Sequence, residues 1–168
     1  MKRCLCAVAA VLSLSLAGCG ALDGATAAGT VPSAPTGTSG FGSVKDSGDL
    51  PDPCTLLTDD EVLDSTGRQI TRIDSDGGHG GDATRYCQWQ QDGGQLAVFL
   101  TRTTTEQFDV RNADAEPVDG VGDDAYSLAG HLYVRYGTMQ IDVYSRGSTD
   151  EENLRDAAAV AKALIPRV

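Results

Sequence analysis

The stretch 131–144 has the sequence HLYVRYGTMQIDVY. Apolar and polar side chains alternate on both sides of Gly137-Thr138, and a period of two is typical of half-buried strands. The stretch predicts a hairpin over 131–136 and 139–144 with a two-residue turn and one buried face. The apolar side chains on the matching faces are Leu132, Val134 and Tyr136 on the first strand, and Met139, Ile141 and Val143 on the second.

A helix is predicted directly after this hairpin, from Thr149 to about Ile165. Thr149 and Glu152 have the spacing of a capping box, and acidic residues in a first turn suit the helix dipole. Its apolar stripe requires a sheet to cover. The stripe consists of Leu154, Ala157, Ala158, Ala161, Leu164 and Ile165.

A shorter helix is predicted from Asp59 to Thr66, because Thr58 and Glu61 form a second capping box and Gly67 stands where a glycine ends helices. Strands are predicted over 69–73, 85–91 and 95–102, the last two as a hairpin. A weaker helical pattern covers 105–112.

These elements predict an α+β fold. We expect a single antiparallel sheet with the short N-terminal helix and the longer C-terminal helix packed on one face. Cys87 and Trp89 share one strand face, which we expect to be the buried one.

The N-terminus has the pattern of an exported lipoprotein. Lys2 and Arg3 precede an apolar run from Cys4 to Ala17 that is too short to span a membrane. The following Leu16-Ala17-Gly18-Cys19 resembles the lipobox of bacterial lipoproteins. This resemblance implies cleavage before Cys19, a lipid on Cys19, and anchorage on the outer face of the cell membrane.

Three regions follow from this interpretation. Residues 1–18 are the expected signal peptide, and 19–50 are a lipidated cysteine and a Gly/Ala/Ser/Thr/Pro tether whose composition cannot bury a core. Residues 51–168 suffice for one globular domain.

Two cysteines, Cys54 and Cys87, remain after the signal peptide and the lipidated residue are set aside. Two thiols in an oxidising compartment are expected to form a disulfide. A bound metal and two free thiols are the alternatives.

The processed chain is strongly acidic. It would keep 11 basic against 24 acidic residues, a formal charge of −13, because only Lys2 and Arg3 leave with the signal peptide. A nucleic-acid interface needs a basic stripe, and the sequence has none. We expect no nucleic-acid partner and no docking on anionic lipid headgroups.

Two glycine-rich stretches were considered as ligand sites. Residues 120–125 superficially match a dinucleotide fingerprint, but the required strand and helix do not flank them, so we expect a turn entering a strand and no cofactor. The loop 74–82 contains the weak calcium candidates Asp74, Asp76 and Asp82, without the bidentate glutamate of a calcium-binding loop. A loop without metal is the favoured interpretation.

Evidence for catalysis is thin. No nucleophile elbow, zinc-protease motif or phosphate-binding loop is present, so no catalytic residue is predicted. His79 lies in the glycine loop, and His131 is interpreted as a solvent-facing strand residue. Either histidine within hydrogen-bond reach of both a nucleophile and a carboxylate would favour an enzyme.

The domain resembles a family of actinobacterial lipoproteins, domain-of-unknown-function family 3558. The resemblance rests on the lipobox and tether, on 52–58 (DPCTLLT), on Cys87-Gln88-Trp89 and on 118–126 (VDGVGDDAY). It implies a Cys54–Cys87 disulfide, an extracytoplasmic location and an antiparallel α+β fold, but no activity. The layout is distantly similar to extracellular sensor domains of some mycobacterial receptor kinases, a fold-level analogy that favours ligand sensing.

The sequence thus leaves two main functional hypotheses. The favoured one is a binding or accessory module for a small ligand or an envelope partner protein, and the alternative is an envelope-acting hydrolase. A structural or immune-facing surface protein is the remaining interpretation.

Overall fold

A computed structural model describes residues 48–79, 81–110 and 114–168. All described residues belong to one compact unit. The expected signal peptide, Cys19 and most of the expected tether lie outside the described residues. Within the part that is described, no helix has both the length and the apolar character needed to cross a membrane.

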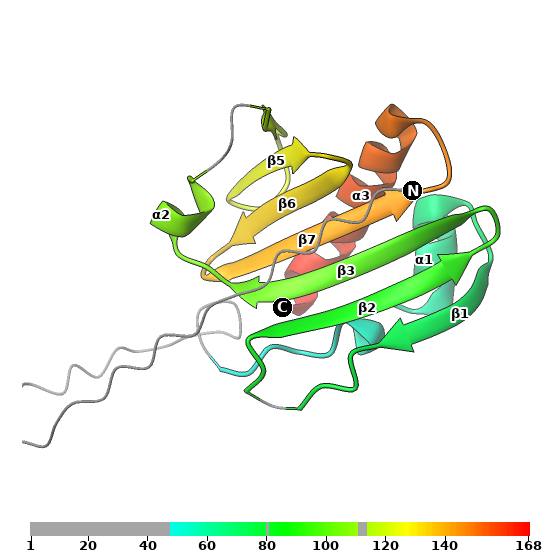
Figure 1. The fold of residues 1–168 in the computed structure, drawn as a ribbon, viewed down its shortest axis with the longest axis horizontal. Coiled ribbons are helices and arrows are strands. Elements are labelled where there is room, and N and C mark those ends of the chain that lie inside the picture. Colours follow the sequence, from blue (N-terminus) through cyan, green and yellow to red (C-terminus); the bar gives the residue numbers. More distant parts are fainter. Residues whose placement is uncertain (1–47, 80, 111–113) are drawn as a thin grey trace, which may run out of the picture. The chain divides into compact units, whose positions relative to one another are not determined.

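The described unit is built on one seven-stranded sheet in which every pair of neighbours is antiparallel (Figure 1). The strand order is β1-β2-β3-β7-β6-β5-β4. The strands are β1 (Ile70–Ser75), β2 (Thr84–Gln91), β3 (Gly94–Arg102), β4 (Glu116–Pro117), β5 (Asp124–Leu128), β6 (His131–Tyr136) and β7 (Met139–Arg146).

Three tight turns set the register of this sheet. The strand pairs β2–β3, β5–β6 and β6–β7 are joined by two residues each, at 92–93, 129–130 and 137–138. Gly93, Gly130 and Gly137 have positive φ in these turns, as tight hairpins require. Pairing of β3 with β7 then joins the two halves.

The helices begin where their capping residues lie. Thr58 and Thr149 each form a complete capping box, which begins α1 (Asp59–Thr66) and α3 (Asp150–Leu164). Gly67, in the left-handed conformation, ends α1. The other helical pieces are η1 (Pro53–Thr55), α2 (Thr105–Phe108) and η2 (Ile165–Arg167).

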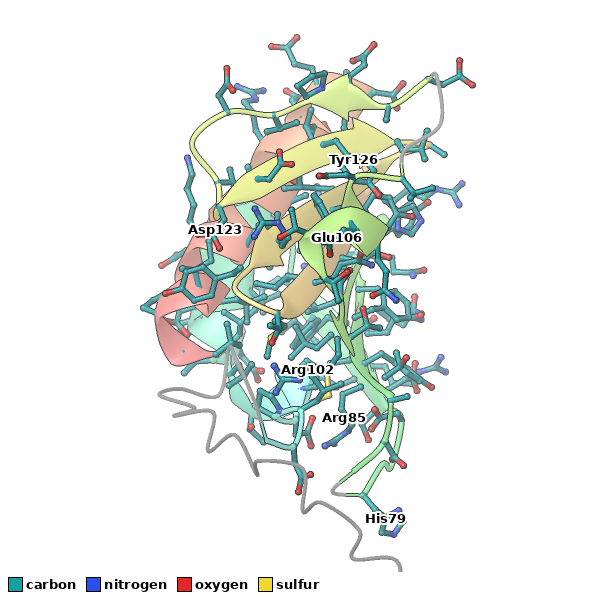
Figure 2. The ribbon with its side chains drawn as sticks, turned by 90° about the vertical axis from the view of Figure 1, so that its left-hand side faces the viewer. His79, Arg85, Arg102, Glu106, Asp123 and Tyr126 are labelled. Atoms are coloured by element: carbon teal, nitrogen blue, oxygen red, sulfur yellow. A yellow bond between two sulfur atoms is a disulfide. The ribbon has the colours of Figure 1, made fainter. Side chains whose placement is uncertain are left out.

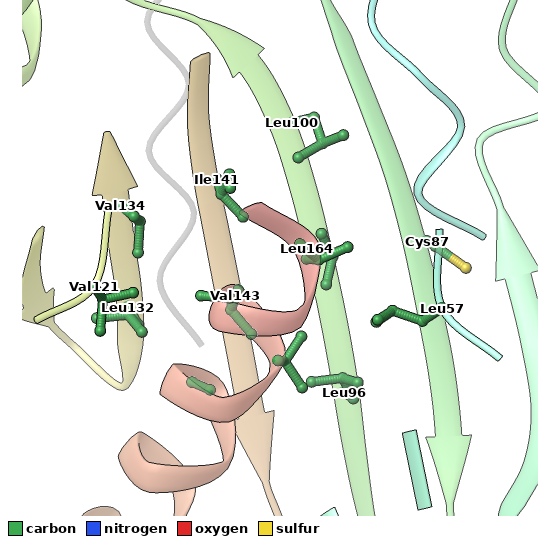
Figure 3. Packing of buried hydrophobic residues seen from close by; sticks show 14 of the residues in the cluster. Leu57, Cys87, Leu96, Leu100, Val121, Leu132, Val134, Ile141, Val143 and Leu164 are labelled. Carbon is green, nitrogen blue, oxygen red and sulfur yellow. The ribbon is translucent and has the colours of Figure 1, made fainter. Parts of the chain in front are cut away.

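The hydrophobic core fills the space between one sheet face and helices α1 and α3 (Figure 3). Alternation along the strands directs their apolar side chains to this face, and Val62 and Val160 enter the core from the helices. Cys87 and Trp89 are buried there as predicted, and Leu50, the last residue of the expected tether, is buried in the same core.

The predicted single antiparallel sheet is confirmed, with three differences. Helix α2 lies against the other face: Ala125 belongs to the core, its neighbour Tyr126 points away from it, and Phe108 of α2 packs on Tyr126 with ring centroids 5.1 Å apart (Figure 2). The helix predicted over 105–112 ends at Phe108, and 111–112 lie outside the described residues. Strand β4 was not predicted.

Candidate ligand-binding site

A pocket of about 790 Å³ lies where strand β6 begins and β7 ends. Pairing between these strands stops at His131 and Tyr144, but β7 continues to Arg146 (Figure 1). The volume is in the range of small-ligand sites. The pocket is bounded by the β5–β6 turn (128–130), by His131, by the end of β7 (144–146), by Ser148 and by the first turns of α3 (150–154), with Asp114, Glu116 and Ser127 completing the lining.

His131 is the feature of this pocket most suited to ligand recognition. Its Nδ1 lies 2.8 Å from Oδ1 of Asp142 on β7. An ionised carboxylate only accepts hydrogen bonds, so Nδ1 donates in this contact, and in the neutral imidazole the other ring nitrogen, Nε2, is an acceptor. The imidazole is therefore held in one orientation.

Asp142 is more enclosed than its place on an uncovered sheet face suggests. Its side chain is 17% exposed, and burial raises its pKa above the ordinary 3.8, whereas the hydrogen bond from His131 opposes that rise. Burial and the nearby Asp142 also raise the pKa of Tyr133. The carboxylate therefore depends on His131 for its stabilisation.

Aromatic rings surround the histidine. The ring centroids of His131 and Tyr144 are 4.8 Å apart, and those of His131 and Tyr133 are 5.7 Å apart. Tyr133 stacks on Tyr126, which continues to Phe108. The sheet face opposite α1 and α3 therefore has a continuous aromatic cluster that reaches the pocket at Tyr144.

The rim of the pocket is negatively charged. Its acidic side chains, all exposed, are Asp114, Glu116, Asp150 and Glu151. Arg146 is the one arginine or lysine in the lining. A positively charged ligand group is favoured at such a rim.

The β5–β6 turn at the pocket carries an unusual backbone conformation. Ala129 has φ of 52° and is the one non-glycine residue with positive φ in the described ranges. For an L-residue this conformation is less stable by about 1–2 kcal/mol. The two-residue turn between β5 and β6 explains it, because such a turn needs positive φ at both of its residues, Ala129 and Gly130.

The prediction that His131 is a solvent-facing strand residue is correct for the direction of its side chain but not for its exposure. The residue does point away from the core, as its phase opposite to Leu132 and Val134 predicts. It is only half-exposed, however, because Asp142, Tyr133 and Tyr144 enclose it.

The hydrolase hypothesis requires a histidine within hydrogen-bond reach of both a nucleophile and a carboxylate. His131 makes the contact with a carboxylate. The carboxylate partner is Asp142, and within the described ranges this is the one hydrogen bond of the His131 side chain. His79 lies apart, at the exposed tip of the β1–β2 loop (Figure 2). Its backbone N–H donates to Asp82.

The three weak calcium candidates take separate roles, and Asp82 accepts from the backbone N–H of His79. Asp74 pairs with Arg72. Asp76 binds Arg85, with Oδ2 3.0 Å from Nε. Burial raises the pKa of Asp76, but hydrogen bonds from Gly78, Arg85 and Tyr86 outweigh this effect, so the pKa is lowered overall. Among the residues that the structure describes, no group of three or more potential metal-ligating side chains converges. The guanidinium of Arg85 is therefore the cation that faces Asp76 in this loop.

Two further arrangements stabilise the scaffold around the pocket. Cys54 and Cys87 form a disulfide with sulfur atoms 1.99 Å apart, which links η1 to β2. Arg68 donates to Asp156 on α3 and to Ser145 on β7, both at 3.0 Å, and so connects helix and sheet next to the pocket.

Comparison with known proteins identifies the family but no characterised relative. No curated protein and no solved structure matches the chain. A family model described as "Protein of unknown function (DUF3558)" matches residues 14–145, which is more than half of the chain. The chain therefore belongs to the DUF3558 family of proteins of unknown function.

Proposed function

We propose that this protein is a lipid-anchored extracytoplasmic binding protein, whose pocket beside His131 holds a small ligand. The observation that carries the proposal is the imidazole of His131, held by Asp142 at the wall of a 790 Å³ pocket. Convergent polar groups in a concave site are the usual mark of ligand binding.

Each group around the pocket has its own role in ligand recognition. In its neutral form His131 accepts a hydrogen bond from the ligand at Nε2, while Asp142 fixes the ring. Tyr144 offers a flat aromatic surface, and the acidic rim favours a cationic group. An oriented side chain loses less entropy on binding than a mobile one.

The proposed anchor is compatible with access to this pocket. The carbonyl of Gly48 accepts a hydrogen bond of 2.8 Å from Arg102. Arg102 pairs with Met139 at one end of the β3–β7 ladder, whereas the pocket residue Arg146 pairs with Gln95 at the other. Gly48, the first described residue, thus lies at the end of the sheet away from the pocket.

Intact mass spectrometry of the membrane-purified protein tests the anchor. We expect the mass of residues 19–168 plus a diacylglyceryl group, with two alkyl groups added by an alkylating reagent only after reduction. An unlipidated mass would refute the anchor, and two thiols that alkylate without reduction would refute the disulfide.

Histidine-selective NMR tests the pocket, because the chain has two histidines and His79 serves as an internal control. The probes are a hexosamine, a diamine, a capped tripeptide and inorganic phosphate at millimolar concentration. We expect at least one probe to shift the His131 signals and leave those of His79 unchanged. If none of the four shifts His131, the proposal fails.

A hydrolase remains the second candidate, because the His131–Asp142 pair resembles the base and its orienting carboxylate in hydrolytic sites. Turnover of 4-nitrophenyl acetate by the purified chain tests it. Activity lost in H131A and retained in H79A would support catalysis, and equal rates in the two variants would refute it.

A further inference from the structure

Strand β1 lies at an outer edge of the sheet, and its main chain has free hydrogen-bonding groups there (Figure 1). The backbone N–H of Asp76 donates to the carbonyl of Tyr86 on β2, so every second residue back from Asp76 directs its N–H and C=O toward β2. Ile73 has the opposite phase, so its N–H and C=O point to the outside of the sheet. No other described residue bonds to these two groups.

The side chain of Ile73 is also open to contact. It stands opposite Trp89 and so lies on the sheet face that carries the core, but it is 44% exposed because, in the described part of the chain, β1 has no neighbour on its outer side. A β-branched side chain on an added strand would remove this apolar surface from water. The middle of β1 therefore offers both main-chain and apolar contacts to a further strand.

The opposite edge of the sheet is closed to such pairing. Strand β4 is two residues long and contains Pro117, which has no N–H to donate. On β1, the register shift between Ile70 and Arg72 confines regular pairing to the segment from Arg72 to Ser75. Strand addition at β1 is therefore short, and it leaves no second edge for a further copy.

The charges of β1 are arranged symmetrically about Ile73, with Arg72 before it and Asp74 after it. When two β1 strands pair antiparallel with Ile73 at the centre, Arg72 of each copy faces Asp74 of the other. Moving the centre to Arg72 places two arginines opposite each other, and moving it to Asp74 does the same with two aspartates. Opposite charges across antiparallel strands stabilise the pair and like charges destabilise it. The charge pattern therefore selects the register centred on Ile73.

We propose that β1 pairs with β1 of a second copy of this chain, centred on Ile73, to form a symmetric dimer with one continuous sheet. Within one copy Arg72 pairs with Asp74, but their side chains are 66% and 39% exposed, so this contact contributes little and both groups are free to turn toward the partner. The chain has a formal net charge of −11, which opposes association in general. The local complementarity of β1 therefore determines how two copies meet, and the two-fold symmetry closes the assembly.

Cysteine cross-linking of the purified full-length chain tests the centre of the pair. All cysteines other than Cys54 and Cys87 are first replaced by serine. Residues in a hydrogen-bonded antiparallel pair have Cα atoms about 5.5 Å apart, which a disulfide spans, so we expect I73C to form a covalent dimer on mild oxidation. The control T71C is exposed on the same strand, but its two copies would lie about 13 Å apart, so we expect it to remain monomeric.

Exchanged charges test the register, with sedimentation velocity for self-association and fluorescence anisotropy for mixtures. In R72D like charges face each other, as they do in D74R, so each variant should self-associate at least about fivefold more weakly than the wild type. A mixture of R72D with D74R restores opposite charges at both positions and should associate at least about fivefold more tightly than either variant alone. The control mixture of R155D with D64R carries the same net charges at exposed positions outside β1 and should behave as the wild type.

Each contrary result overturns the proposal. Equal cross-linking of I73C and T71C would indicate random collision, and absence of an I73C dimer would show that the two strands do not meet at this residue. A mixture of R72D with D74R that gains nothing over its components would refute the register. The proposed function is unaffected in each case, because the lining of the pocket beside His131 contains no residue of β1.

Discussion

His131 and Asp142 are diagonal neighbours on strands β6 and β7, with Nδ1 and Oδ1 2.8 Å apart on the sheet face opposite α1 and α3. Their strand partners are Tyr144 and Tyr133, and these two rings complete the enclosure. The raised pKa of the Asp142 carboxyl makes the stability of the domain sensitive to pH.

The variant D142N tests the raised pKa of Asp142. Because the folded state holds this proton more tightly than the unfolded state, the free energy of unfolding falls as pH rises from the ordinary 3.8 through the folded pKa. We expect D142N to lack this fall and to match or exceed the wild type at neutral pH, since its amide oxygen still accepts from His131. Urea unfolding across acidic and neutral pH measures both effects. A fall of the same size in D142N would contradict the assignment.

The pKa of Glu61 is shifted in the opposite direction from that of Asp142. A hydrogen bond from Arg167 is the largest of the influences that lower its pKa from 4.5 to about 2. The folded state is then stabilised above the unfolded pKa, and this contribution is lost as pH falls from 4.5 toward 2. We expect R167A to show a weaker loss of stability in that window, measured by acid unfolding followed by circular dichroism. R155A, which affects an exposed pair with Glu152, should follow the wild-type curve.

The variant R68A tests the connection between α3 and the sheet. The side chains of Arg68 and Asp156 are 12% and 20% exposed, so removal of the guanidinium leaves a largely buried carboxylate without its partner. We expect the free energy of unfolding to fall by about 3 kcal/mol, measured by urea denaturation. R155A is the control, because its pair with Glu152 is exposed and contributes less than about 1 kcal/mol. Equal losses would refute a special role for Arg68.

Removal of the disulfide tests the link between η1 and β2. Cys54 and Cys87 are 33 residues apart, and a loop of that length predicts a loss of about 4 kcal/mol on removal in the chain-entropy model. We expect C54A/C87A to lose this amount in urea denaturation, and a reductant to destabilise the wild type but not the variant. An unchanged midpoint for the reduced wild type would contradict the prediction.

Local sequence signals predicted most of the fold. Thr58 and Thr149 cap helices with side chains three residues away, so α1 and α3 could be placed from the sequence at their observed starts. The hairpin turn at Gly137-Thr138 and the period of two likewise predicted β6 and β7. Strand β4 was missed because two residues ending in Pro117 form no periodic pattern.

Part of the site also had a signal in the sequence. A two-residue turn at Gly137-Thr138 places Tyr133 opposite Asp142, which makes His131 a diagonal neighbour of that carboxylate. The predicted hairpin therefore already contained the His131–Asp142 pair, although it was not recognised there.

The sequence by itself determined the starts of α1 and α3, the register of the 131–144 hairpin and the direction in which its side chains point, because these depend on contacts between residues close in the chain. Only the tertiary structure decided that β7 extends beyond β6, that the start of α3 lies beside the end of β7, and that Glu116 and Glu151 share one rim. These features join segments far apart in sequence, and packing of the whole core positions them. The pocket is therefore a property of the assembled sheet and helix.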